Sequence, residues 1–75
     1  MEDWETRVMD TLTDPMAVYL DRYDAMRECF YKLGTPTNPD RLLKVVVEFN
    51  AEGRGTIITA YPSRNIPTGE RQKWP

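Results

Sequence analysis

The chain has 75 residues, of which 29% are charged, and its formal net charge is −2 at neutral pH. A chain of this length forms one small domain, so either a dimer or a bound partner supports the fold, or a plain small core is enough. One cysteine and no histidine are present, which excludes an intramolecular disulfide and the usual zinc sites. No metal or other cofactor is predicted.

The start of the chain, Met1-Glu2-Asp3, is acidic where a secretory signal carries basic residues. No apolar stretch approaches the ~18 residues of a membrane span. A free cysteine fits a reducing compartment. We therefore predict a cytoplasmic protein that has no membrane contact.

Charge is unevenly distributed along the chain. Residues 1–40 carry nine acidic and four basic side chains, whereas residues 41–75 carry three acidic and six basic ones. The basic half permits an anionic partner such as RNA. The same asymmetry fits a solvated surface whose two ends attract each other.

The first predicted element is a helix over residues 2–12. Trp4, Val8 and Leu12 recur every four residues and share one helix face. The helix should end at Asp14, because the following proline disfavours helical geometry in the residue before it.

Two shorter segments follow the helix. Residues 16–20 predict a strand, and residues 27–33 predict a second strand through their aromatic content. A helix over residues 22–33 is the alternative for the second segment. Residues 34–40 hold one glycine and two prolines and predict a loop.

Residues 42–49 and 56–61 have the densest β-branched content of the chain and predict a β-hairpin. Because side chains alternate along a strand, one face of the first strand is apolar and should point at the helix. Its members are Leu43, Val45, Val47 and Phe49. On the second strand we expect Ile58 and Ala60 to face the core, which leaves Thr59 and Tyr61 on the opposite face beside Lys44.

These elements predict a single α+β domain over residues 1–75. An N-terminal helix packs on one face of a curved antiparallel sheet of about four strands. The polar tail, residues 62–75, either adds an edge strand or wraps the domain.

Several motifs along the chain resemble one known family. They are Thr11-Leu12 with Asp14-Pro15, Phe30-Tyr31-Lys32, Leu43 to Val47, Ile57 to Pro62, and Gly69-Glu70 with Trp74-Pro75. Together they resemble small bacterial proteins of the barnase–EndoU–colicin–RelE-like (BECR-fold) superfamily. Its members are metal-independent ribonucleases, and many are toxins.

The resemblance implies a toxin-type ribonuclease that cleaves single-stranded RNA on an open sheet face. The positions that match the family pattern are Tyr31, Lys32, Lys44, Thr59, Tyr61 and Arg64. We expect RNA as the substrate, and an antitoxin or a second copy of the chain as the protein partner.

Transesterification of RNA needs a base for the 2′-OH, cations for the phosphate and an acid for the leaving oxygen. Lys44, Tyr61 and Thr59 are the candidate catalytic set. The candidate RNA-contacting residues are Tyr31, Lys32, Arg64 and Arg27. Stacking of a tyrosine on an unpaired base would contribute about 1–3 kcal/mol.

Each candidate also has a structural interpretation. Lys44 can be an exposed strand residue that pairs with an acid such as Glu48, and Cys29 can be a small buried apolar residue. Related sequences often carry a histidine in or before the first helix, which this chain lacks. The alternative function is therefore a non-catalytic binding module of the same fold, and a further one is a fragment that a partner completes with missing elements.

Overall fold

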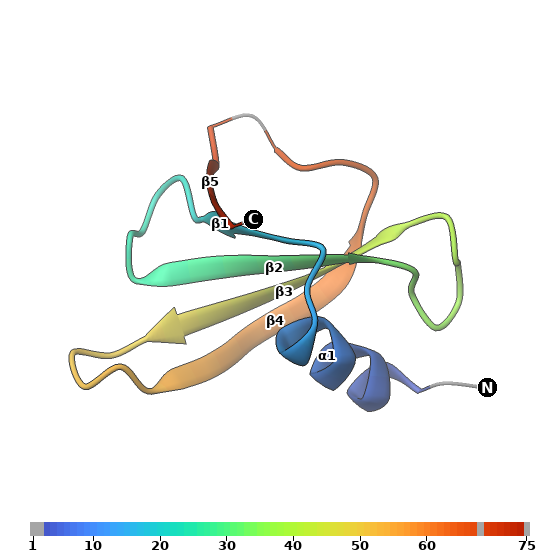
Figure 1. Ribbon diagram of the computed structural model, residues 1–75, viewed down its shortest axis with the longest axis horizontal. Coiled ribbons are helices and arrows are strands. Elements are labelled where there is room, and N and C mark those ends of the chain that lie inside the picture. The colour runs from blue at the N-terminus through green and yellow to red at the C-terminus, as the bar shows by residue number, and fades with distance from the viewer. Residues whose placement is uncertain (1–2, 68, 75) are drawn as a thin grey trace.

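A computed structural model describes residues 3–67 and 69–74. It contains helix α1 (Trp4–Thr13) and strands β1 (Ala17–Leu20), β2 (Arg27–Leu33), β3 (Leu42–Phe49), β4 (Gly55–Ser63) and β5 (Arg71–Trp74). The strands form one antiparallel sheet in the order β4-β3-β2-β1-β5, with α1 packed against β2 and β3 (Figure 1). The predicted α+β class is confirmed, and the sheet has five strands.

Residues next to each end of helix α1 determine where the helix begins and ends. The Oδ1 atom of Asp3 accepts a hydrogen bond from the backbone N–H of Thr6 at 2.7 Å, which satisfies one free donor of the first turn. The helix ends before Asp14-Pro15, as predicted. The predicted first residue, Glu2, lies outside the described residues.

Residues 27–33 form a strand, so the alternative helix over residues 22–33 is wrong. The strand is central, and its alternate side chains contribute to the two opposite faces of the sheet. Cys29 and Tyr31 are fully buried on one face, while Phe30 packs beside Val45 on the face that α1 covers. Burial on both faces favours a strand here, despite residues that tolerate a helix.

The β3–β4 hairpin has the predicted facing on β3 but not along all of β4. Leu43, Val45 and Val47 are buried beneath α1, and Ala60 packs with them as expected. The register shifts between Val46 and Val47, so β4 carries one extra residue at a β-bulge.

The bulge corrects the prediction for the two isoleucines of β4. Ile57 is paired with Val47 and therefore shares the α1 face, whereas Ile58 was expected there. Ile57 and Ile58 are 47% and 44% exposed, so neither adds much to the core. A bulge inverts the facing of every residue on one side of it, which alternation alone does not anticipate.

Both faces of the sheet carry a buried apolar cluster. Under α1, the cluster of Leu43, Val45 and Val47 is completed by partly buried side chains that include Val8 and Leu12 of the helix. On the opposite face, the cluster has these members: Cys29, Tyr31, Val46, Tyr19, Leu42 and Ile66. Ile66 lies in the connection between β4 and β5, so this connection covers the second face.

Arg7 joins the helix to the loop after β2. Its Nη2 atom donates to the carbonyl oxygens of Leu33 at 3.0 Å and Gly34 at 2.9 Å, and Nη1 donates to Asp10 at 2.9 Å. Its side chain is 13% exposed. Since α1 is only ten residues long, its stability depends on such tertiary contacts.

We expect Arg7→Ala to lower the free energy of unfolding by about 1–3 kcal/mol, because it leaves two carbonyl groups without their charged donor. Urea unfolding followed by circular dichroism measures this change. Arg54→Ala is the control: Arg54 lies in the exposed hairpin turn, and its replacement should change stability by less than about 0.5 kcal/mol. Equal effects of the two variants would contradict the assigned role of Arg7.

Candidate functional site

The β4–β5 connection, residues 64–67 and 69–70, crosses the sheet from the end of β4 to β5 beside β1 (Figure 1). It covers the part of the sheet face on which Lys44 lies, so this face is not open as the family resemblance implied. Lys44 is 5% exposed. A lysine in this position needs a partner for its charge, because burial of an unpaired ammonium is costly.

The partner of Lys44 is Glu70, at the end of the β4–β5 connection. Lys44 Nζ donates to Glu70 Oε2 at 2.7 Å, and the two side chains are 6% and 3% exposed. The hydroxyl of Tyr31 donates to Glu70 Oε1 at 2.6 Å. Both carboxylate oxygens of Glu70 are thus occupied by buried donors. We call Lys44, Glu70 and Tyr31 the Lys44 cluster.

Aromatic rings surround the ammonium group. Lys44 Nζ lies 5.5 Å from the ring centre of Tyr31 and 5.7 Å from that of Tyr61, distances at which the faces of aromatic rings attract cations. Tyr19 meets the Tyr31 ring edge-on, with 5.8 Å between ring centres. The cluster is therefore packed as part of the core and held by directional hydrogen bonds.

Burial shifts the proton equilibria of this face. Desolvation, followed by the hydrogen bond to Glu70, raises the pKa of Tyr31 far above its usual value. Desolvation, followed by the charge of Glu70, raises the pKa of the Cys29 thiol to about 11. For Lys44, desolvation lowers the pKa, but the hydrogen bond to Glu70 and the surrounding groups outweigh it, so the pKa is raised overall. At neutral pH, Lys44 is therefore a charged ammonium, and Tyr31 and Cys29 are protonated and neutral.

The three predicted catalytic residues lie on one sheet face. Tyr61 pairs directly with Lys44 across β3 and β4, and Thr59 pairs with the next residue on that face, Val46. Tyr61 is 42% exposed and forms the accessible rim of the Lys44 cluster, and Thr59 is also exposed. The predicted neighbours come together, but the lysine among them is enclosed.

The predicted RNA-contacting residues do not form one surface. Tyr31 is fully buried. Lys32 pairs with Leu43 and lies on the α1 face, where its ammonium is 3.1 Å from Asp10 and 3.3 Å from Asp14. Arg64 is exposed in the β4–β5 connection.

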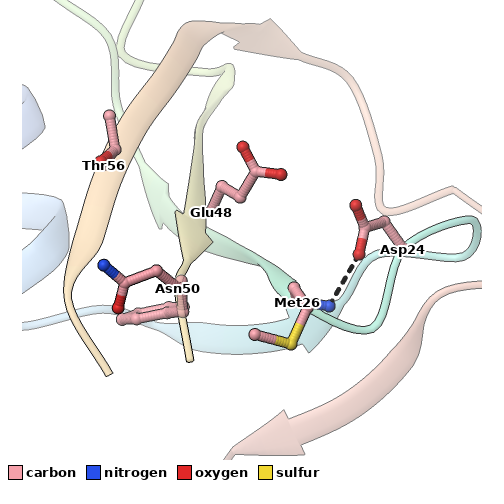
Figure 2. A pocket seen from close by; sticks show the side chains of 6 residues that line it. Asp24, Met26, Glu48, Asn50 and Thr56 are labelled. Atoms are coloured by element: carbon pink, nitrogen blue, oxygen red, sulfur yellow. Dashed lines mark hydrogen bonds between the residues drawn. The ribbon is translucent and has the colours of Figure 1, made fainter. Parts of the chain in front are cut away.

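Arg27, the fourth predicted RNA-contacting residue, lies between two acids. Its Nε atom is 3.7 Å from a carboxylate oxygen of Asp24 and 3.7 Å from one of Glu48. A hollow of about 260 Å³ adjoins these acids at the hairpin end of the sheet (Figure 2). Its lining residues are Asp24, Met26, Glu48, Phe49, Asn50 and Thr56. Two carboxylates in the lining make this hollow unfavourable for a phosphate.

Potential metal ligands also meet beside the Lys44 cluster. One ligand atom each from Asp21, Cys29 and Glu70 lies within 4.8 Å of the others. Glu70 already accepts from Tyr31 and Lys44, and the raised pKa of Cys29 disfavours the thiolate that binds metals. The ammonium of Lys44 would also repel a cation. These residues do not fit a metal ion.

Glu70 is the residue of the site that the sequence analysis did not assign. It lies 26 positions after Lys44, in a polar tail without periodicity, and no local pattern connects the two. The available signal was electrostatic: a strand lysine between apolar neighbours needs a buried acid if its face of the sheet is covered. Glu48, the acid named as a partner, pairs with Arg27 and Thr56 across the sheet instead.

We expect Glu70→Gln to lower the free energy of unfolding by about 3–5 kcal/mol, because it leaves the Lys44 ammonium buried without an opposite charge. A triple variant, Tyr31→Phe with Lys44→Met and Glu70→Leu, removes all three polar groups together and should recover most of that loss. Urea unfolding curves of the three proteins test this. A Glu70→Gln protein as stable as the parent would contradict the assigned pairing.

The Cys29 thiol should make stability fall with rising pH between 9 and 11. Below its usual pKa of 9.0 the thiol is protonated in both states; between 9 and 11 only the unfolded chain loses the proton. The slope from this group is at most about 1.4 kcal/mol per pH unit. Tyr31 and Lys44 also have raised pKa values and add to the loss of stability at alkaline pH. Cys29→Ala is therefore the control, and its free energy of unfolding should depend less steeply on pH. Urea unfolding at a series of pH values measures both slopes. Identical slopes would contradict a protonated, buried thiol.

Among the described residues, no helix has the length and apolar content needed to cross a membrane. Comparisons with protein-family models, with curated proteins and with solved structures gave no match to this chain. The resemblance to BECR-fold ribonucleases therefore stays a prediction.

Proposed function

We propose that this protein is a small, non-catalytic interaction module in which the Lys44 cluster holds the β4–β5 connection against the sheet. The observation that carries the proposal is the 2.7 Å contact between Lys44 and Glu70, with side chains only 6% and 3% exposed. Groups that act on a large substrate must reach its reacting atoms within hydrogen-bond distance. These two groups contact each other and the interior.

The proton equilibria support a structural role. A general base that works at neutral pH has a pKa near 7, so that a substantial fraction of it is unprotonated. The pKa values of Lys44 and Tyr31 are raised, so neither side chain gives up its proton in this range. Lys44 and Tyr31 therefore keep their protons at neutral pH, as groups that hold a segment of the chain in place do.

Three of the basic side chains predicted to act on RNA are not available to its phosphates. Binding to a phosphate backbone requires basic groups that are available to the phosphates. Lys44, Lys32 and Arg27 each lie beside one or more acids, and the net charge of the chain is −2.

A ribonuclease is the second candidate, and Glu70 is the observation that favours it. Its carboxylate can take the proton of a 2′-OH, while the Lys44 ammonium, 2.7 Å away, balances charge on the phosphate. Tyr61, on the rim, would give a proton to the leaving oxygen. This chemistry requires the β4–β5 connection to move away from the sheet so that RNA reaches the two buried groups.

We expect the full chain to leave a labelled single-stranded RNA intact in the presence of EDTA, because Lys44 and Glu70 are enclosed. Gel electrophoresis of the RNA over a range of protein concentrations measures cleavage. The Tyr61→Phe protein is the matched variant, since it removes only the exposed hydroxyl next to the cluster, and the triple variant without the polar cluster serves as the blank.

Cleavage that scales with folded parent protein, is absent from the triple variant and falls at least about tenfold in Tyr61→Phe would overturn the non-catalytic proposal. Cleavage that is equal in all three preparations identifies a contaminating nuclease and leaves the chain non-catalytic.

A further inference from the structure

The two edge strands of the sheet differ in length and charge. β5 is four residues long and carries Arg71 and Lys73. β4 is nine residues long, has seven exposed residues and contains no charged side chain from Gly55 to Ser63. Natural sheets protect their edges with short strands, charges, prolines and bulges. The β5 edge is short and charged, whereas β4 is long and uncharged and has only Pro62 and the bulge as protection.

Free backbone groups of β4 occupy a defined window. Asn50 N donates to Arg54 O across the hairpin at 3.0 Å, and Phe49 N donates in the other direction, to Met26 O, at 2.8 Å. Even-numbered residues of β3 therefore bond to β4, and the pairing places their partners at positions 56, 59, 61 and 63. The alternate residues Gly55, Ile57 and Ala60 direct their N–H and C=O groups outward.

Pro62 limits this window at one end, because proline has no N–H to donate. The free edge that can pair with another strand is thus residues 55–60. Among the described residues, no other strand pairs with this edge. An added strand would receive main-chain hydrogen bonds from Gly55 and Ile57 before the bulge and from Ala60 after it.

Basic side chains flank the window at both ends. Arg54 precedes β4 in the hairpin turn, and Arg64 follows β4, next to Arg41 before β3. None of the three has an ion pair among the described residues, in contrast to Lys32 and Lys44. At the hairpin end, Glu52 and Glu48 offset Arg54, whereas at the other end only Asp40 offsets Arg41 and Arg64, so the Arg41–Arg64 end is the more basic one.

We propose that the β4 edge receives an extended segment of another protein whose uncharged β-branched centre is flanked by acidic residues. The segment pairs with residues 55–60 as a sixth strand, and its acidic ends lie next to Arg54 and to Arg41 and Arg64. The inference rests on the proposed function, for which it names the class of partner. Main-chain hydrogen bonds supply affinity, and the charges set the choice of partner.

A second copy of the chain fits this edge less well. A second β4 strand has no acidic residue from Gly55 to Ser63 and is itself flanked by Arg54 and Arg64, so it offers no opposite charge to the basic ends of the edge. The bulge would also occur in both strands of such a pair and would interrupt their hydrogen bonding. An acidic-flanked segment from another protein avoids both conflicts.

The test uses a fluorescein-labelled peptide with alternating valine and threonine between two acidic residues at each end. We expect it to bind the full chain in fluorescence anisotropy, and a peptide with lysines at both ends to bind at least about tenfold more weakly. Arg64→Glu should weaken binding of the acidic peptide about tenfold. Arg71→Glu, the same charge change on the β5 edge, is the matched control and should leave binding unchanged.

Ile57→Pro removes an outward N–H without removing a bond to β3 and should abolish binding, with folding checked by circular dichroism. Hydrogen exchange of the parent gives a measurement that needs no variant. The amides of Gly55, Ile57 and Ala60 should become protected when the acidic peptide binds.

Equal binding of the acidic and basic peptides, or protection at amides other than these three, would overturn the proposal. A parent chain that is dimeric in light scattering and becomes monomeric as Ile57→Pro would assign the edge to a second copy instead. Failure of the peptide to bind overturns this inference alone, whereas Tyr61-dependent RNA cleavage overturns the proposed function, so the two failures are distinguishable.

Discussion

The structure depends on one buried ion pair. In the described part of the chain, the five-stranded sheet has a helix on one face and no regular structure over the other. The β4–β5 connection covers that second face with few apolar side chains. Lys44 and Glu70 bring opposite charges together beneath it, and Tyr31 occupies the remaining carboxylate oxygen. Ion pairs in an interior are often no more stable than apolar replacements. The role of this pair is to fix where the polar β4–β5 connection crosses the sheet, because its hydrogen bond is directional.

Local patterns were sufficient for most of the fold. The helix before Asp14 and the buried face of β3 follow from periodicity and from proline. The central strand over residues 27–33 was predicted from its aromatic content, with a helix as the alternative. The bulge in β4 did not follow, since the extra residue is set by pairing with β3 and leaves no mark in the order of β-branched residues. The positions of Ile57 and Ile58 were therefore inverted.

The candidate site was predictable only in part. Lys44, Thr59 and Tyr61 share a face because strands alternate and because a two-strand pairing fixes which residues meet. Whether that face is open depends on a segment that carries no secondary-structure signal. Glu70 turns an expected exposed lysine into a buried one, and this change separates a catalytic interpretation of the same residues from a structural one.

The pairing of β5 with β1 joins segments more than fifty positions apart in the chain, Val18 with Trp74 among them. The β3–β4 hairpin, by contrast, closes through a turn of a few residues. Closing a long loop costs more chain entropy than closing a short one, and non-local contacts form late in folding. We therefore expect assembly to run from the hairpin outward. In that order Lys44 loses its water shell only when Glu70 arrives, so dehydration of the ion pair would coincide with completion of the sheet.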